Sequence, residues 1–162
     1  MINKNLLHGL LMGIFLLGFV LVSTEAAIPD CTAAYPSKAI LWPPNHKFHT
    51  ITINGVTDSD GDSVAITITS IYSDEATAAA SGSGGKKHAP DAIIGVGGST
   101  AQVRAERSGA APHNGRVYTI NFTATAGGET CTGSVYVGVP HSKKSTPVND
   151  SLNDGIRYDA TV

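Results

Sequence analysis

The sequence predicts an all-β fold, an antiparallel immunoglobulin-like β-sandwich of about seven strands. Short segments with alternating apolar and polar residues recur along the chain, separated by turns rich in Gly, Pro, Asn and Asp. Glycine accounts for 18 of the 162 residues, whereas aromatic residues make up only 6%. No segment shows the apolar stripe of an amphipathic helix, so a helical bundle is disfavoured.

The first 27 residues have the features of an export signal. Lys4 gives a basic start, residues 6–22 are apolar, and residues 23–27 are mostly small, as a signal peptidase requires. An uncleaved membrane anchor is the alternative, but a run of about 17 residues is short for a membrane span. We therefore expect cleavage near Ala27 and export to the periplasm, the cell surface or the extracellular space, with no membrane insertion afterwards.

Alternation of apolar and polar residues predicts the strands. Residues 49–53 form one half-buried strand and residues 64–69 the next, joined through the turn at residues 58–62. Residues 102–107 form a third strand. The clearest strand covers residues 117–125, and its inward face carries Tyr118, Ile120, Phe122 and Ala124.

The last predicted strand begins at Cys131, which shares a face with Val135, Val137 and Val139. The only other cysteine is Cys31. An oxidising compartment allows these two residues to form a disulfide, and two free buried thiols are the alternative. We predict the disulfide, which would join the N-terminal strand to the last strand.

Two segments lack a clear pattern. Residues 73–99 are rich in Gly, Ala and Ser and predict a long exposed loop. Residues 142–162 are polar and predict a mobile tail, which could add a strand to a neighbouring copy and cause self-association. The predicted organisation is therefore a signal peptide at 1–27, a sandwich domain at 28–141 and a polar tail.

The turn at residues 58–62 is a candidate calcium site. Asp58, Asp60 and Asp62 crowd three like charges into five residues, and these repel one another unless a cation neutralises them. The turn is not an EF-hand, because its sixth position is Ser63 rather than Gly. We expect a structural Ca²⁺ ion bound with a dissociation constant of about 10⁻⁴–10⁻³ M. An ordinary Asp-Gly turn is the alternative.

Several motifs together resemble a bacterial secreted immunoglobulin-like domain related to the hyalin-repeat and cadherin-like groups. These motifs are LWPPNHK (41–47), GVTDSDGD (55–62), RAERSG (104–109), GRVYTINFTAT (115–125) and VPH (139–141). The resemblance implies a non-enzymatic binding or structural role, such as adhesion, for nearly the whole exported part. It also implies that the acidic turn binds calcium, with Asp91 and Glu106 as further candidate ligands.

The segment from Trp42 to His46 is a candidate ligand-binding loop. An exposed tryptophan beside prolines can stack on a sugar, so a carbohydrate-binding module is an alternative function. Its ligand contacts would be Trp42, Asn45 and His46. The favoured interpretation is that Trp42 packs over the sandwich edge, while Asn45 and His46 anchor the turn by hydrogen bonds.

Other functional classes receive less support. A transition-metal site is not predicted, because His46 and His49 point to opposite faces of a strand and His88 lies in a distant loop. Arg104 and Glu106 share a strand face and predict either an ion pair or a calcium-binding Glu106.

The net charge of −2 argues against nucleic-acid binding, which requires a basic surface. No G-x-S-x-G pattern is present, so a small secreted hydrolase is the weakest alternative. The expected partner is an extracellular protein or polysaccharide.

Overall fold

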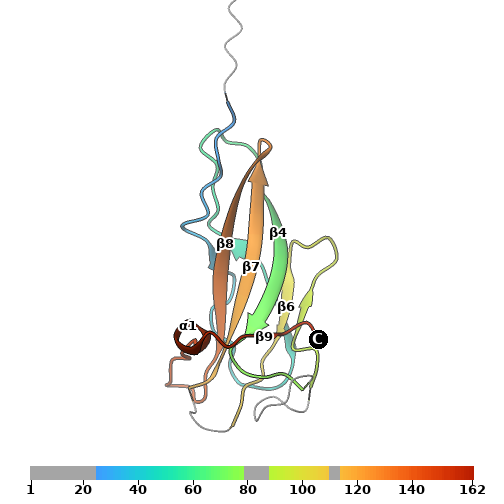
Figure 1. The fold of residues 1–162 in the computed structure, drawn as a ribbon, viewed down its shortest axis with the longest axis vertical. Coiled ribbons are helices and arrows are strands. Elements are labelled where there is room, and N and C mark those ends of the chain that lie inside the picture. Colours follow the sequence, from blue (N-terminus) through green and yellow to red (C-terminus); the bar gives the residue numbers. More distant parts are fainter. Residues whose placement is uncertain (1–24, 79–87, 110–113) are drawn as a thin grey trace, which may run out of the picture.

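The computed structural model describes residues 25–78, 88–109 and 114–162, which form an all-β sandwich of antiparallel sheets (Figure 1). The predicted signal peptide therefore lies almost entirely outside the described residues. Among the described residues, no helix is both long and apolar enough to cross a membrane.

Three sheets make up the described fold. The largest has the strand order β8-β7-β4-β9, and its strands are Glu129–Val139, Arg116–Ala126, Ala65–Ser73 and Tyr158–Asp159. The second has the order β2-β6-β5, with strands Phe48–Ile51, Ala101–Arg104 and Ala92–Ile94. A small sheet pairs β1 (Tyr35–Pro36) with β3 (Ile53–Asn54), and one short helix, α1, covers Ser151–Asp154.

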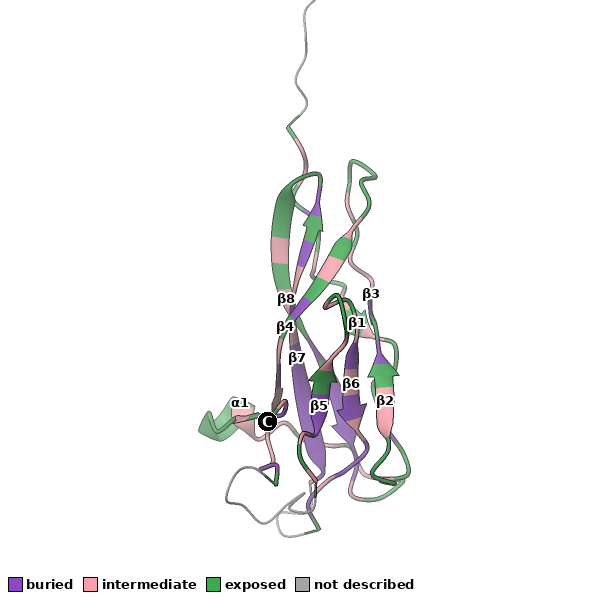
Figure 2. Cartoon of the chain, turned by 90° about the vertical axis from the view of Figure 1, so that its right-hand side faces the viewer, coloured by how far each residue is buried: buried purple, intermediate pink, exposed green. Residues whose placement is uncertain are grey.

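The core lies between the two larger sheets, and β7 runs through its centre (Figure 2). The predicted inward face of β7 is confirmed, because Tyr118, Ile120, Phe122 and Ala124 are each at most 1% exposed. The second sheet contributes Ile51 from β2, together with Ala101 and Val103 from β6, all of them fully buried. Alternating residues on an extended strand therefore bury one face against the opposite sheet, as the sequence pattern requires.

One end of the sandwich is held by the predicted disulfide. Cys31 and Cys131 are bonded, with their Cα atoms 6.0 Å apart and a sequence separation of 100. Cys131 lies opposite Ala124 in the β7–β8 ladder, close to the turn that joins these two strands. We call this part of the molecule, with the β7–β8 turn and the turn at residues 58–62, the acidic end.

The predicted long loop at residues 73–99 is interrupted by a strand. β5 (Ala92–Ile94) pairs with β6 through Ala92 opposite Val103 and Ile94 opposite Ala101. β6 itself ends at Arg104, three residues earlier than the sequence predicts, so Glu106 lies beyond the strand. The sequence did not predict β5 because the strand has only three residues and the segments beside it are rich in Gly and Ser.

The C-terminal tail packs against the sandwich, and the expectation that it is mobile is wrong for its last residues. β9 pairs with β4 through Asp159 opposite Tyr72. Ala160 is fully buried; its N–H donates to the carbonyl of Ile71 (3.0 Å), and its carbonyl accepts from the N–H groups of Asp91 (2.9 Å) and Ala92 (2.6 Å). The tail therefore connects the edges of the two larger sheets.

Candidate functional site

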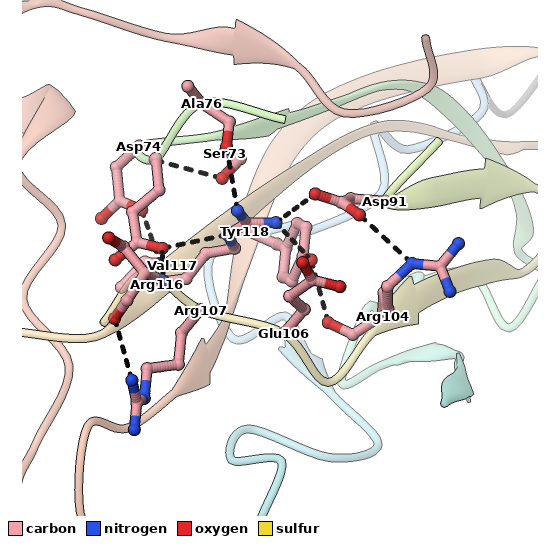
Figure 3. Close-up of polar contacts among 12 residues, drawn as sticks. Ser73, Asp74, Ala76, Asp91, Arg104, Glu106, Arg107, Arg116, Val117 and Tyr118 are labelled. Atoms are coloured by element: carbon pink, nitrogen blue, oxygen red, sulfur yellow. Dashed lines mark hydrogen bonds and ion pairs between the residues drawn. The ribbon is translucent and has the colours of Figure 1, made fainter. Parts of the chain in front are cut away.

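The end of the sandwich opposite the disulfide is built around buried charges, and we call it the charged end. Arg116 is the first residue of β7, and both its side chain and that of Asp91 are fully buried. One Arg116 nitrogen, Nη1, donates to Asp91 Oδ2, while Asp91 Oδ1 accepts from Arg104 Nε at 3.2 Å (Figure 3). Asp91 therefore joins Arg104, the last residue of β6, to Arg116, the first residue of β7, and so links the two larger sheets.

Arg116 uses every nitrogen of its guanidinium. Nε lies 3.3 Å from Glu75 Oε2, Nη2 donates to the carbonyl of Ala76 (3.1 Å), and Nη1 also contacts the hydroxyl of Tyr118 (3.2 Å). Burial alone would lower the pKa of Arg116, but the neighbouring Tyr118 and the Asp91 carboxylate raise it. We call Glu75, Asp91, Arg104, Arg116 and Tyr118 the charge network.

Tyr118 completes the network from the middle of the core. Its hydroxyl donates to the carbonyl of Arg104 at 2.9 Å, so a buried polar group is satisfied. Full burial raises the pKa of Tyr118 above its ordinary value, and the phenol stays protonated. The network therefore joins β7 to the end of β6 and to the segments before β5 and after β4.

Asp74 ties the C-terminal tail to the same end. Its Oδ1 accepts from the N–H of Val117 (2.8 Å), and its Oδ2 from the N–H of Asp150 (3.4 Å). Asn114 donates in turn to both carboxylate oxygens of Asp150 (2.6 and 2.7 Å). Burial, with the nearby Glu75 and Asp150 charges as smaller causes, raises the pKa of Asp74 to about 6.

The carboxylate of Glu106 contacts the imidazoles of two histidines, not the guanidinium of Arg104. Its Oε2 lies 3.1 Å from His46 Nδ1 and 2.6 Å from His88 Nδ1, and the two imidazole rings are 5.0 Å apart. The expected Arg104–Glu106 ion pair is wrong, because Arg104 pairs with Asp91 instead. Glu106 is only 2% exposed, whereas the side chains of His46 and His88 are 52% and 36% exposed.

The Trp42–His46 loop is anchored as expected, but its tryptophan faces solvent. Asn45 Oδ1 accepts from the N–H of Lys47 (3.1 Å). His46 donates its N–H to the carbonyl of Ala105 (3.0 Å), and its own carbonyl accepts from Arg104 (3.1 Å). Trp42 is 41% exposed, more than the expected packing over the sandwich edge implies.

Hydrogen bonds from backbone N–H groups to its own carboxylates hold the acidic turn in shape. Asp58 Oδ1 accepts from the N–H groups of Asp60 (3.0 Å) and Asp62 (3.1 Å), and Asp60 Oδ2 accepts from the N–H of Ala27 (2.7 Å). The Asp62 carboxylate lies against the β7–β8 turn, where a Cβ on Gly127 would clash with it. Asp58 Oδ2 is shielded from solvent and has no hydrogen-bond partner among the described residues.

The five predicted calcium ligands do not form one site. Asp91 touches Arg116 at the start of β7, whereas Asp62 lies beside the turn after β7 ends. β7 has 11 residues, so the two groups are roughly 30 Å apart. Only one cluster of at least three metal-ligating side chains occurs in the described ranges, and it consists of His46, His88 and Glu106.

Sequence reasoning missed the partners that build the charged end. Arg116 precedes an apolar strand and resembles an ordinary polar strand start, although it is fully buried. His88 follows two lysines in a loop that carries no local signal of a contact with Glu106. Contacts between residues far apart in sequence decide both cases, and spacing within one segment cannot reveal them.

Comparison with known proteins gave no match: no family model, no curated protein and no solved structure matches the chain. What the protein does therefore has to be inferred from its own residues and their geometry.

Proposed function

We propose that this chain is an exported, non-enzymatic immunoglobulin-like domain that binds an extracellular polysaccharide or protein through the loop that carries Trp42. The observation that carries this proposal is the combination of a solvent-facing indole with a fixed loop. Trp42 is 41% exposed, and both backbone groups of His46, four residues later, are hydrogen-bonded to the end of β6. A rigid aromatic side chain gives contact area without a large cost in conformational entropy.

The charge network supports a binding role over a catalytic one. General acids and bases in enzymes are accessible to substrate, and their protons can move at the working pH. Asp91 and Arg116 are instead fully buried and paired with each other, and Tyr118 keeps its proton. These groups hold three connecting segments of the charged end in fixed positions, which suits a scaffold that presents loops.

Retention on polysaccharides tests the role of Trp42. The chain with its disulfide intact should be retarded by affinity electrophoresis in at least one insoluble or gel-forming polysaccharide, and Trp42→Ala should abolish the retardation. Tyr136→Ala is the matched control, because Tyr136 is a similarly exposed aromatic residue (45%) on β8. Equal retardation of the wild type and Trp42→Ala would rule out Trp42 as the sugar contact.

Export is tested by the N-terminus of the protein in its producing cell. The Cys31–Cys131 bond favours an oxidising compartment, where such disulfides persist. Mass spectrometry of the exported fraction should find a chain that starts at or near Ala27 and contains no free thiol. An intact Met1 in a cytoplasmic fraction would contradict this part of the proposal.

Calcium stabilisation is a second proposal, and it is confined to Asp58, Asp60 and Asp62. The unpartnered Asp58 Oδ2 favours it, because a shielded carboxylate oxygen without a donor can be satisfied by a cation. At about ten times the dissociation constant, calcium would add on the order of 1.4 kcal/mol to the free energy of unfolding. Thermal unfolding with calcium and with chelator should differ in the wild type but not in Asp60→Ala/Asp62→Ala.

A further inference from the structure

We infer that Glu106, His46 and His88 form a binding site for one divalent transition-metal ion of the zinc class, separate from the acidic turn. Each of the three residues offers one ligand atom, and these atoms all lie within 4.8 Å of one another. Glu106 Oε2 is 3.1 Å from His46 Nδ1 and 2.6 Å from His88 Nδ1. A tetrahedral zinc ion with ligands at about 2.1 Å requires ligand atoms roughly 3.4 Å apart. Small side-chain movements therefore convert the observed arrangement into a coordination shell.

The buried carboxylate of Glu106 provides the electrostatic reason for a cation. A buried negative charge is costly unless a positive group compensates for it. The arginines of the charge network are committed elsewhere, since Arg104 and Arg116 both pair with Asp91. Arg107, the residue after Glu106, donates to the carbonyls of Ser108 and His141. The described partners of the Glu106 carboxylate are the two imidazoles, which are neutral when deprotonated, so a divalent ion would supply the missing charge.

The contact between His88 and Glu106 points to the same conclusion. His88 Nδ1 lies 2.6 Å from Glu106 Oε2, yet this shielded nitrogen makes no hydrogen bond within the described part of the chain. Two electronegative atoms at that separation repel each other unless a proton or a cation lies between them. Metal coordination by both atoms removes this repulsion.

The backbone of His46 is held in an unusual conformation that directs its ring to the site. Its φ is +63°, in the left-handed region that residues other than glycine seldom occupy. Such backbone strain persists where surrounding contacts maintain it, and it is concentrated at functional sites. The hydrogen bonds of His46 to Ala105 and Arg104 supply those contacts.

The ligand set selects the metal. Two imidazole nitrogens and one carboxylate suit Zn²⁺ and related ions, whereas Ca²⁺ takes six to eight oxygen ligands. Three protein ligands leave the fourth tetrahedral position for water or for a donor from a partner. Both histidines are partly exposed, so an ion can enter from solvent, and binding would join the Trp42 loop to the segment before β5.

Titration with Zn²⁺ alone tests the site, using the chain with its disulfide intact, calorimetry for affinity and Co²⁺ absorption for geometry. The wild type should bind one ion per chain, and Co²⁺ should give the intense visible bands of tetrahedral coordination. Loss of a ligand in His46→Asn or His88→Gln should weaken Zn²⁺ binding at least about 100-fold, because removing even an outer-shell partner typically costs 10–100-fold. Asparagine tolerates the positive φ at position 46.

His49→Gln is the matched control, because His49 lies on β2, three residues after His46, and is outside the cluster. It should bind Zn²⁺ as the wild type does. Unchanged affinity in both His46→Asn and His88→Gln would overturn the inference, and so would an equal loss in His49→Gln. Since His46 and His88 are on the surface, these variants remain informative even if Glu106→Gln fails to fold.

Discussion

Both ends of the sandwich contain several carboxylates, but their environments are opposite. At the acidic end, Asp60 and Asp62 remain exposed, and the chain is held there by the Cys31–Cys131 bond. At the charged end, Asp91 is fully buried and is held by two arginines. One end therefore depends on a covalent bond and the other on paired charges.

The comparison shows that burial, rather than the number of charges, determines how strongly a carboxylate shapes the fold. Water screens the repulsion between exposed carboxylates, so a turn with three aspartates can form at modest cost. A buried carboxylate must be paired with high geometric accuracy, and each partner then restricts the segment that carries it. The fixed loops of the charged end follow from this requirement.

The largest expected effect comes from breaking the charge network. Arg116→Met removes the main partner of Asp91 and leaves a buried carboxylate with Arg104 alone. Removing one member of a buried ion pair typically costs about 3–5 kcal/mol, because it leaves an uncompensated buried charge. Urea unfolding should show this loss in the free energy of unfolding.

Asp62→Asn is the corresponding change at the acidic end. Because Asp62 is exposed, we expect a change in the free energy of unfolding of about 0.5 kcal/mol or less when both proteins are measured with chelator. At the charged end, the double variant Arg116→Met/Asp91→Leu should recover part of the stability that Arg116→Met alone loses, since two neutral side chains need no pairing. Equal effects of Arg116→Met and Asp62→Asn would refute the contrast between the two ends.

Loss of the disulfide should have the next largest effect, and it should act from the other end. The bond closes a loop with a sequence separation of 100, so Cys31→Ser/Cys131→Ser should lower the free energy of unfolding by about 2–5 kcal/mol. Denaturant unfolding with and without reductant measures this loss. An unchanged unfolding midpoint after complete reduction would contradict it.

Hydrogen exchange can show which backbone amides lose protection in each of the two variants. In the double serine variant, amides of β8 beside the β7–β8 turn should exchange faster, because Cys131 lies in that part of the ladder. In Arg116→Met, the increase should instead be concentrated at the start of β7 and in β5 and β6. The same pattern in both variants would show that the ends do not respond independently.

The fold was predictable where the signal is local. Alternation identified β7 and its buried face because each strand residue responds to the layer directly beneath it. The disulfide was predictable because two cysteines offer a single intramolecular pairing, and the signal-like N-terminus predicts an oxidising compartment. β5 was missed because a strand of three residues is too short to show a period, and its partner lies elsewhere in the sequence. β9 has only two residues, so its sequence signal is weak.

The candidate site was less predictable, because its residues come from segments that lie far apart in the sequence. The acidic turn is visible in the sequence because its carboxylates are neighbours, but its geometry follows from backbone hydrogen bonds. The cluster of His46, His88 and Glu106 joins three segments that only the folded sheets bring together. Spacing correctly separated His46 from His49, but it gave no sign that the fold brings the distant His88 to the same carboxylate as His46.

A pH-dependent effect separates the partly buried Asp74 from an exposed aspartate. Burial raises the pKa of Asp74 in the folded chain to about 6, above its ordinary value of 3.8. The folded state therefore holds the proton more tightly, and the wild type gains stability as the pH falls from about 6 towards 3.8. Asp74→Asn lacks this gain but retains an acceptor for the Val117 N–H, so its melting temperature relative to the wild type should be highest near pH 7.5 and should fall on acidification.

Asp159→Asn is the control with the opposite sign. The hydroxyl and then the N–H of Thr161 lower the pKa of Asp159, which is exposed, so its contribution to stability is present at neutral pH and is lost on acidification. The melting temperature of Asp159→Asn relative to the wild type should therefore rise as the pH falls. Thermal melts between pH 4 and 8 distinguish the two aspartates, and parallel curves for both variants would show that burial does not set the sign.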